Sequence, residues 1–127
     1  MKTSMAICVP FLSVPDIAQT IKWYEGIGFK CTGTNHIWEP ECELNWAELN
    51  WEGATFMIGP DVRSVIPEIK GMGLYFQVES IDKIIEVLTG RGEIIEINPE
   101  TFYGRKEVVF KDINGLQITF SCEPDKK

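Results

Sequence analysis

The chain has 127 residues, 44% hydrophobic and 24% charged, a composition typical of one globular domain. Its formal net charge of −7 argues against nucleic acid as a partner, because this field would repel a phosphate backbone. No apolar run approaches the roughly 20 residues of a membrane helix, so no membrane partner is expected.

The cysteines and the N-terminal stretch indicate a cytoplasmic protein. Cys8, Cys31, Cys42 and Cys122 lie at spacings without a Cys-x-x-Cys motif. In a chain able to build its own core, such cysteines are more typical of reduced thiols than of a disulfide framework. The apolar N-terminal stretch contains Pro10 and alternates as a strand does, so we assign it to the mature protein and not to a signal peptide.

In chain order, the first half predicts a strand, a helix, a short strand and a loop. Asp16 is a suitable N-cap for the helix, and Ile17, Ile21 and Tyr24 share one helical face. The predicted ranges are 6–14 for the first strand, 16–25 for the helix, 29–32 for the next strand and 33–44 for the loop.

Residues 46–58 predict a hairpin with its turn at Glu52-Gly53, where a positive φ is needed. Residue i then pairs with residue 105 − i, which places one apolar set on a single face: Ala47, Leu49, Trp51, Ala54, Phe56 and Ile58. The other face is mixed, with Trp46, Glu48, Asn50, Thr55 and Met57. Such a face is typical either of a cavity wall or of an ordinary half-exposed sheet.

The second half repeats the first. It predicts strands at 74–78 and 93–97, a helix from Ser80 to Leu88, and a hairpin over 106–121. A shift of 64 residues lays Val14 on Val78, and a shift of 62 lays Gly53 on Gly115. We therefore predict an α+β fold of two tandem βαβββ units, about 4–60 and 70–123. Together they would form a single domain over 1–127, with pseudo-twofold symmetry and curved mixed sheets around a concave cavity.

Three stretches resemble a known superfamily: PFLSVPDIAQTIKWYEGIGF, VESIDKIIEVLTGRG and YGRKEVVFKDINGLQITF. They are similar to the vicinal oxygen chelate superfamily, which includes glyoxalase I, extradiol dioxygenases and the bleomycin-resistance proteins. The resemblance covers nearly the whole chain and implies the two-unit fold. It is less specific for function, because this fold hosts several chemistries.

The resemblance also implies four positions for metal ligands, one on the first and one on the last strand of each repeat. In this sequence they fall at Val9, Met57, Gly73 and Thr119, and none of these is a His, Glu, Asp or Gln. A divalent metal needs about three or four converging donors. We therefore expect no metal and no cofactor.

Strand alternation selects the candidate ligand-binding residues that would face the cavity: Phe11, Trp46, Glu48, Asn50, Met57, Tyr75, Gln117 and Thr119. On the strand over 106–111 we favour Val108 and Phe110 for the cavity side, although the turn at 112–115 is compatible with more than one loop length.

Glu48 is the acid of most interest, because burial among aromatic residues requires a partner for its charge. That partner is either a ligand cation or an internal group such as Arg105. His36, on the predicted loop, is expected at the surface. The acidic run Glu39, Glu41 and Glu43 is expected in a solvated loop, or at the rim of a site for a cation.

These observations favour a metal-independent protein that sequesters a small aromatic or cationic molecule, similar to the bleomycin-resistance branch, with no catalytic residue and with a homodimer as its assembly. The alternative is a glyoxalase- or dioxygenase-like lyase or isomerase with displaced metal ligands, or with Glu48 as a general base. A third possibility is a protein without a small ligand, whose dimer interface is its function.

Overall fold

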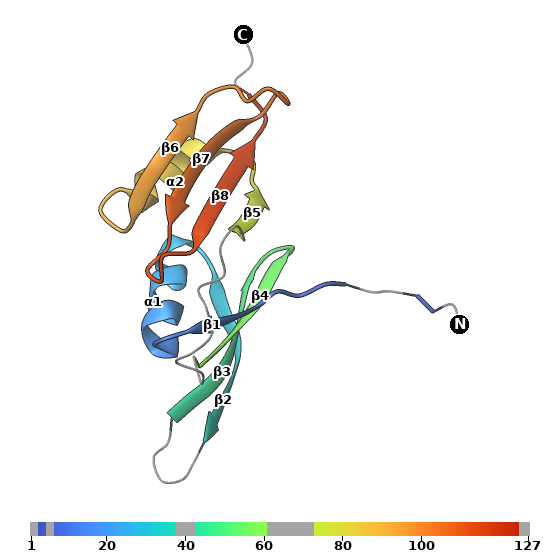
Figure 1. Cartoon of the computed structure of the whole chain (residues 1–127), viewed down its shortest axis with the longest axis vertical. Helices are drawn as coiled ribbons and strands as arrows, with labels where there is room; N and C mark the ends of the chain where they lie inside the picture. The colour runs from blue at the N-terminus through green and yellow to red at the C-terminus, as the bar shows by residue number, and fades with distance from the viewer. Residues whose placement is uncertain (1–2, 5–6, 38–42, 61–72, 125–127) are drawn as a thin grey trace. The chain divides into compact units, whose positions relative to one another are not determined.

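The computed structural model describes residues 3–4, 7–37, 43–60 and 73–124, which fall into two compact units divided at Val62–Arg63. Each unit contains one helix and one four-stranded mixed sheet (Figure 1). The predicted βαβββ repeat is therefore confirmed. That the two units make up one domain remains a prediction.

The first unit contains β1 (Phe11–Val14), α1 (Ile17–Ile27), β2 (Lys30–Ile37), β3 (Glu43–Trp51) and β4 (Ala54–Pro60). Its sheet has the order β1-β4-β3-β2, in which β1 and β4 are parallel and the other pairs are antiparallel. Helix α1 begins after Asp16, whose carboxylate accepts the Gln19 N–H at 2.9 Å. The helix ends at Gly28, where φ is 128°.

The core of the first unit is aromatic. Tyr24 is 1% exposed, and its ring centroid lies 5.0 Å from that of Phe56 and 5.4 Å from that of Phe29. Edge-to-face rings of this kind add about 0.5–1.5 kcal/mol per pair beyond the area that they bury. Because Phe56 is on β4, these contacts show which face of the sheet α1 covers.

The β3–β4 hairpin has the predicted register, with Trp51 opposite Ala54, Leu49 opposite Phe56 and Ala47 opposite Ile58. The side chains of these last two pairs, Leu49 with Phe56 and Ala47 with Ile58, are at most 1% exposed. The positive φ of the turn, 52°, lies on Glu52.

Strand β2 corrects the sequence prediction at its C-terminal end. It continues through residues 33–37, where a loop was predicted, and His36 lies on it opposite Leu44. The register shifts twice, between Cys31 and Gly33 and between Asn35 and His36. These irregularities break the alternation by which a strand is recognised in a sequence. Glu39, Glu41 and Cys42 lie outside the described residues.

The second unit contains β5 (Gly73–Gln77), α2 (Ile81–Leu88), β6 (Glu93–Asn98), β7 (Lys106–Lys111) and β8 (Gln117–Cys122). Its strand order, β5-β8-β7-β6, repeats that of the first unit. Ser80 caps α2 as predicted, accepting the Asp82 N–H at 3.3 Å. The core beneath α2 is fully buried and consists of Ile81, Leu88, Val108, Phe110, Ile118 and Phe120.

Two further findings concern cysteines and membranes. Cys8, Cys31 and Cys122, the cysteines in the described ranges, are free thiols. A bilayer-crossing helix is not found in the described part of the chain, whose two helices have 11 and 8 residues.

Candidate functional site

Each sheet has one face that its own helix does not cover, here called the open face. On the first unit, the open face brings together five of the predicted binding residues. One register row crosses the sheet from Phe11 on β1 through Met57 on β4 and Glu48 on β3 to Gly33 on β2. Trp46 and Asn50 lie on the same face, two residues to either side of Glu48.

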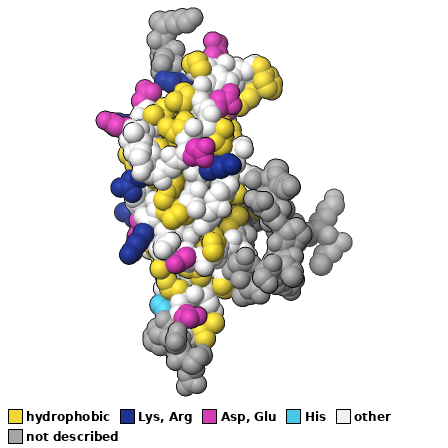
Figure 2. Space-filling model, turned by 60° about the vertical axis from the view of Figure 1, so that its left-hand side comes forward, with side chains coloured by type: hydrophobic (Ala, Val, Ile, Leu, Met, Phe, Trp, Pro, Cys, Tyr) yellow, Lys and Arg dark blue, Asp and Glu magenta, His cyan; other side chains and the backbone are white. Residues whose placement is uncertain are grey.

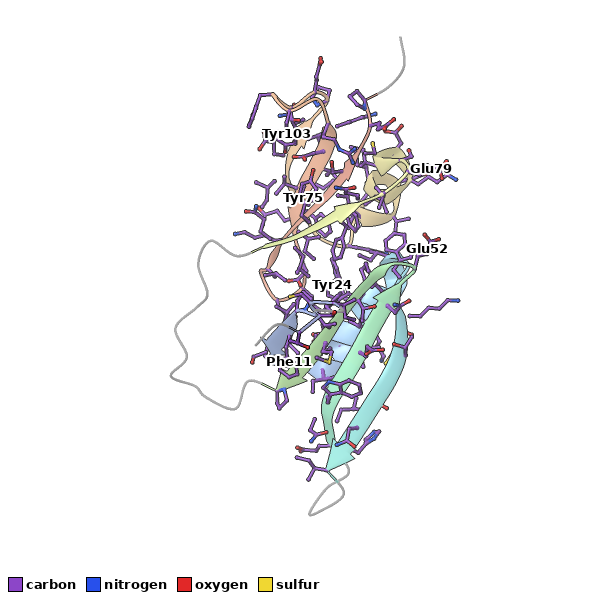
Figure 3. All side chains as sticks on the ribbon, turned by 90° about the vertical axis from the view of Figure 1, so that its right-hand side faces the viewer. Phe11, Tyr24, Glu52, Tyr75, Glu79 and Tyr103 are labelled. Carbon is purple, nitrogen blue, oxygen red and sulfur yellow. The ribbon has the colours of Figure 1, made fainter. Side chains whose placement is uncertain are left out.

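Two glycines make room for the aromatic side chains of this face. A Cβ added to Gly33 would lie 3.1 Å from the Trp46 ring, so that ring packs directly over the backbone of β2. A Cβ added to Gly59 would lie 2.7 Å from the ring of Phe11. Both rings therefore pack against strand backbone at the two glycines, and Phe11, labelled in Figure 3, still has 55% of its surface exposed.

The polar groups of this face are half-buried and hydrogen-bonded. Glu48 accepts a bond of 2.8 Å from the Thr32 hydroxyl, and Asn50 donates one of 2.7 Å to the hydroxyl of Thr55. Glu48 thus has a neutral internal donor, and the Arg105 side chain donates instead to Ser121 at 2.9 Å. The carboxylate of Glu48 keeps further acceptor positions for a ligand.

On the second unit, the structure contradicts the expectation for Val108 and Phe110. Both are fully buried on the face that α2 covers, opposite Phe120 and Ile118. The neighbouring Lys106, on the same side of β7, forms an ion pair with Asp82 of α2 at 3.1 Å. The open face instead receives the alternate residues of β7, which are Glu107, Val109 and Lys111.

The physical reason is the length of the β7–β8 loop. Asp112 N–H donates to the Leu116 carbonyl at 2.9 Å, which leaves three residues in the loop. Gly115 takes a positive φ of 82°, as expected in a three-residue hairpin connection. A two-residue connection would have moved every residue of β7 to the other face.

The predicted residues Tyr75, Gln117 and Thr119 are on the open face of the second unit. Tyr75 pairs with Thr119, and Gln117 pairs with Gly73. Gln117 is exposed, whereas Thr119 is 8% exposed.

A cluster that we did not predict surrounds Glu107. The Tyr75 hydroxyl donates to one of its carboxylate oxygens at 2.5 Å, and the Tyr103 hydroxyl donates to the other at 2.5 Å. Glu107 is only 7% exposed, but the two tyrosines, both labelled in Figure 3, are 49% and 50% exposed. We call Tyr75, Tyr103 and Glu107 the Tyr–Glu–Tyr cluster.

The cluster fixes the protonation state of Tyr103. The hydrogen bond to Glu107, together with partial loss of hydration and the negative charge of Glu107, raises the pKa of Tyr103 from 10.0 to about 12. Tyr103 therefore stays a hydroxyl donor at any physiological pH. With both oxygens of Glu107 engaged by donors, this carboxylate is a polar anchor and is poorly placed to remove a proton from a substrate.

Arg105 braces the loop before β7. Its backbone N–H donates to the Thr101 hydroxyl at 2.9 Å, and its carbonyl accepts the Thr101 N–H at 2.7 Å. These bonds, with that from Arg105 to Ser121, hold Tyr103 in place beside Glu107.

Comparison with known proteins agrees with this fold. The sequence model of the Glyoxalase/Bleomycin resistance protein/Dioxygenase superfamily matches residues 6–120. The chain belongs to this superfamily. No curated protein sequence matches it.

Several solved structures are similar in fold over almost their whole length. A glyoxalase family protein from Enterococcus faecalis has 25% identity and a TM-score of 0.69, covering 91% of this chain and 96% of its own. One from Bacillus cereus has 15% identity and a TM-score of 0.73, covering 98% and 97%. The fosfomycin resistance protein FosX from Listeria monocytogenes has 14% identity and a TM-score of 0.72, covering 94% of each chain.

The residues at the four positions where metal-dependent superfamily members would place ligands do not form a donor set. Met57 pairs with β1 and Thr119 pairs with β5, so the two residues occupy equivalent positions in the two units, as the shift of 62 residues predicted. A thioether and a hydroxyl are poor ligands for one divalent ion. Within residues 3–4, 7–37, 43–60 and 73–124, no three His, Cys, Asp or Glu side chains lie close enough together to hold a metal.

Proposed function

We propose that this protein binds and sequesters a small aromatic or cationic molecule without using a metal, in the manner of the bleomycin-resistance proteins. Binding would use the open faces of the two sheets. The candidate contact residues predicted from strand alternation are, on the first unit, Phe11, Trp46, Glu48, Asn50 and Met57, and, on the second unit, Tyr75, Gln117 and Thr119.

One observation supports this function above the others. The open face of each unit places accessible aromatic rings beside a carboxylate that accepts from hydroxyl groups and forms no ion pair with any residue in the described ranges. In the first unit these are Trp46, Glu48 and Thr32; in the second they are Tyr75, Glu107 and Tyr103. Rings supply contact area, and a carboxylate without a cationic partner attracts a positive charge.

A resistance role is consistent with the names of the superfamily and of one structurally similar protein. The superfamily name includes bleomycin resistance proteins, and FosX is a fosfomycin resistance protein. For this chain we propose only that a small molecule is removed from solution by binding.

The test is a thermal-shift screen with matched aromatic cations and neutral aromatics, performed with and without a chelator. A ligand that binds only the native state raises its melting temperature, and we expect this for at least one aromatic cation with the chelator present. Elemental analysis of the purified protein accompanies the screen. If every ligand fails to shift the melting temperature, or chelation abolishes the shift, the proposal is wrong.

Glu48→Gln then locates the binding face. If the cation binds at Glu48, its affinity falls by roughly 1–2 kcal/mol in this variant, less than the loss at a fully buried charge pair because Glu48 is half-buried. Glu52→Gln removes the same charge from the exposed hairpin turn and is the matched control.

A further inference from the structure

The carboxylate of the Tyr–Glu–Tyr cluster is held by neutral hydroxyl groups. The two carboxylate oxygens of Glu107 each accept one bond, and both donors are neutral hydroxyls. Glu107 forms no ion pair with any described residue. Lys106 is paired with Asp82, and Arg105 donates to the hydroxyl of Ser121, the residue opposite Glu107. A buried carboxylate stabilised only by neutral donors still attracts a positive charge placed above it.

Access to this charge is through the two tyrosine rings. Glu107 itself is 7% exposed, whereas about half of the surface of Tyr75 and of Tyr103 is exposed. A ligand approaching the open face of the second unit therefore meets ring surface first, with the carboxylate behind it. This arrangement favours a cation with an apolar surface over a small hydrated metal ion, because the ligand contacts ring surface first.

The hydrogen bonds also make the rings better hosts for a cation. A phenol that donates to an anion gains electron density on its oxygen and ring, because hydrogen-bonded groups polarise one another. Tyr103 remains a neutral donor up to high pH, since its pKa is about 12. The faces of both rings, already negative from their quadrupole, become more so.

A third ring extends this surface. Phe102 is fully exposed, and its centroid lies 4.8 Å from that of Tyr103 with an angle of 88° between the ring planes. Two rings at right angles present an aromatic corner. Aromatic surfaces of this kind, with an acid nearby, are how proteins recognise quaternary ammonium groups.

We propose that Tyr75, Tyr103 and Glu107 form a recognition site for an organic ammonium ion, in which the ring faces contact the cation and Glu107 supplies the opposing charge. The inference rests on the proposed binding function and names its ligand class. It places the cation on the second unit, at Glu107, and not on the first unit at Glu48.

The experiment uses the full chain labelled with ¹⁵N and two probes of the same shape, choline and its neutral isostere 3,3-dimethylbutan-1-ol. Amide shifts are followed during titration with each probe. We expect choline to perturb the amides around residues 75, 103 and 107, and to bind about tenfold more tightly than the alcohol, the combined effect of one charge and the ring contacts. Equal affinity for the two probes would overturn the inference.

Variants separate charge from ring surface. Glu107→Gln keeps the shape and should weaken choline binding about tenfold, whereas the affinity of the neutral alcohol stays within about twofold. Glu86→Gln is the matched control, because it removes an equal charge from an exposed side chain on α2, the helix that covers the other face of this sheet. It should leave the affinity for choline within about twofold.

A second pair of variants covers the case in which Glu107→Gln does not fold, which its amide spectrum would reveal. Tyr75→Leu removes a ring and should weaken choline binding by about two- to fivefold, whereas Tyr75→Phe keeps the ring and should weaken it less. Equal losses in the two variants would contradict a ring contact.

The failure of this inference differs from the failure of the proposed function. If Glu48→Gln weakens binding of choline and Glu107→Gln does not, the cation site is in the first unit, and the inference is overturned while the binding function stands. If neutral aromatics stabilise the protein and choline does not bind, the ligand class is wrong. If nothing binds in either experiment, both proposals fall.

Discussion

Among single residues, Tyr103 allows a specific prediction about its pKa. Its proton is retained because it makes the hydrogen bond to Glu107 and because its removal would create a second negative charge there, so the pKa of Tyr103 is raised to about 12. The near-ultraviolet absorbance of tyrosinate, measured as the difference between the unmodified chain and Tyr103→Phe, should therefore show a midpoint near 12. In Glu107→Gln this midpoint should fall toward the ordinary 10.0, because the largest cause of the shift has been removed.

The control for this titration is Glu86→Gln, which changes the net charge equally from an exposed position on α2, on the other side of the sheet. It should leave the Tyr103 midpoint in place. A midpoint near 10.0 in the unmodified chain would show that the hydroxyl does not donate to Glu107 in solution.

The same residues show how far the candidate site could be predicted. Glu48, Met57 and Phe11 were placed on one face by alternation alone, because the Glu52-Gly53 turn allows one register. Glu107 could not be placed from the sequence because its face depends on a loop that is compatible with more than one length. Tyr103 was missed because it is on a loop, where no strand alternation indicates the direction of a side chain.

The loop between β7 and β8 is therefore the element that determines the composition of the second open face. Asp112 is 7% exposed, and its Oδ1 accepts the N–H groups of Asn114 at 2.8 Å and Leu116 at 2.9 Å. Asp112→Ala should lower the free energy of unfolding by about 1–3 kcal/mol in denaturant titration, because both donors lose their acceptor. Asp112→Asn retains an acceptor oxygen and should cost clearly less. Equal losses would indicate that the charge, and not the acceptor, stabilises the loop.

The pairing of β5 with β8 depends on Gly73. A Cβ at this position would lie 2.9 Å from the backbone oxygen of Gln117, and a backbone atom in a strand cannot move aside as a side chain can. Gly73→Ala should therefore cost about 1–3 kcal/mol of unfolding free energy. Gly53→Ala is the control: a Cβ there meets nothing within 4 Å, so the change should stay within about 0.5 kcal/mol. Similar costs for both would show that the contact at Gly73 is relieved without strain.

Helices and hairpins could be predicted from the sequence because their determinants are local. Asp16 and Ser80 cap the two helices, and the 3.6-residue period places Ile81, Ile84 and Leu88 on the buried face of α2. The second half of β2 could not be predicted, because its two register shifts remove the period of two on which strand prediction depends.

For the whole molecule, internal repetition was the strongest feature of the sequence. The shift of 64 residues carries Phe11 to Tyr75, and the shift of 62 carries Met57 to Thr119; in the structure Phe11 pairs with Met57, and Tyr75 pairs with Thr119. Two units with the same strand order follow directly. The duplication predicts the fold of each unit, but the open faces have diverged, so the ligand does not follow from it.

The last prediction is that the protein is a homodimer. Four Trp, three Tyr and seven Phe are a large aromatic content for 127 residues, and several of the larger hydrophobic side chains are exposed, among them Phe11, Tyr75, Ile95, Ile97 and Phe102. On the face drawn in Figure 2, hydrophobic side chains reach the surface between charged ones. Interfaces between chains are enriched in aromatic residues, so association would remove this surface from water. Light scattering at micromolar concentration should give twice the chain mass of 14.4 kDa. A mass of one chain across that range would mean that the open faces act within a monomer.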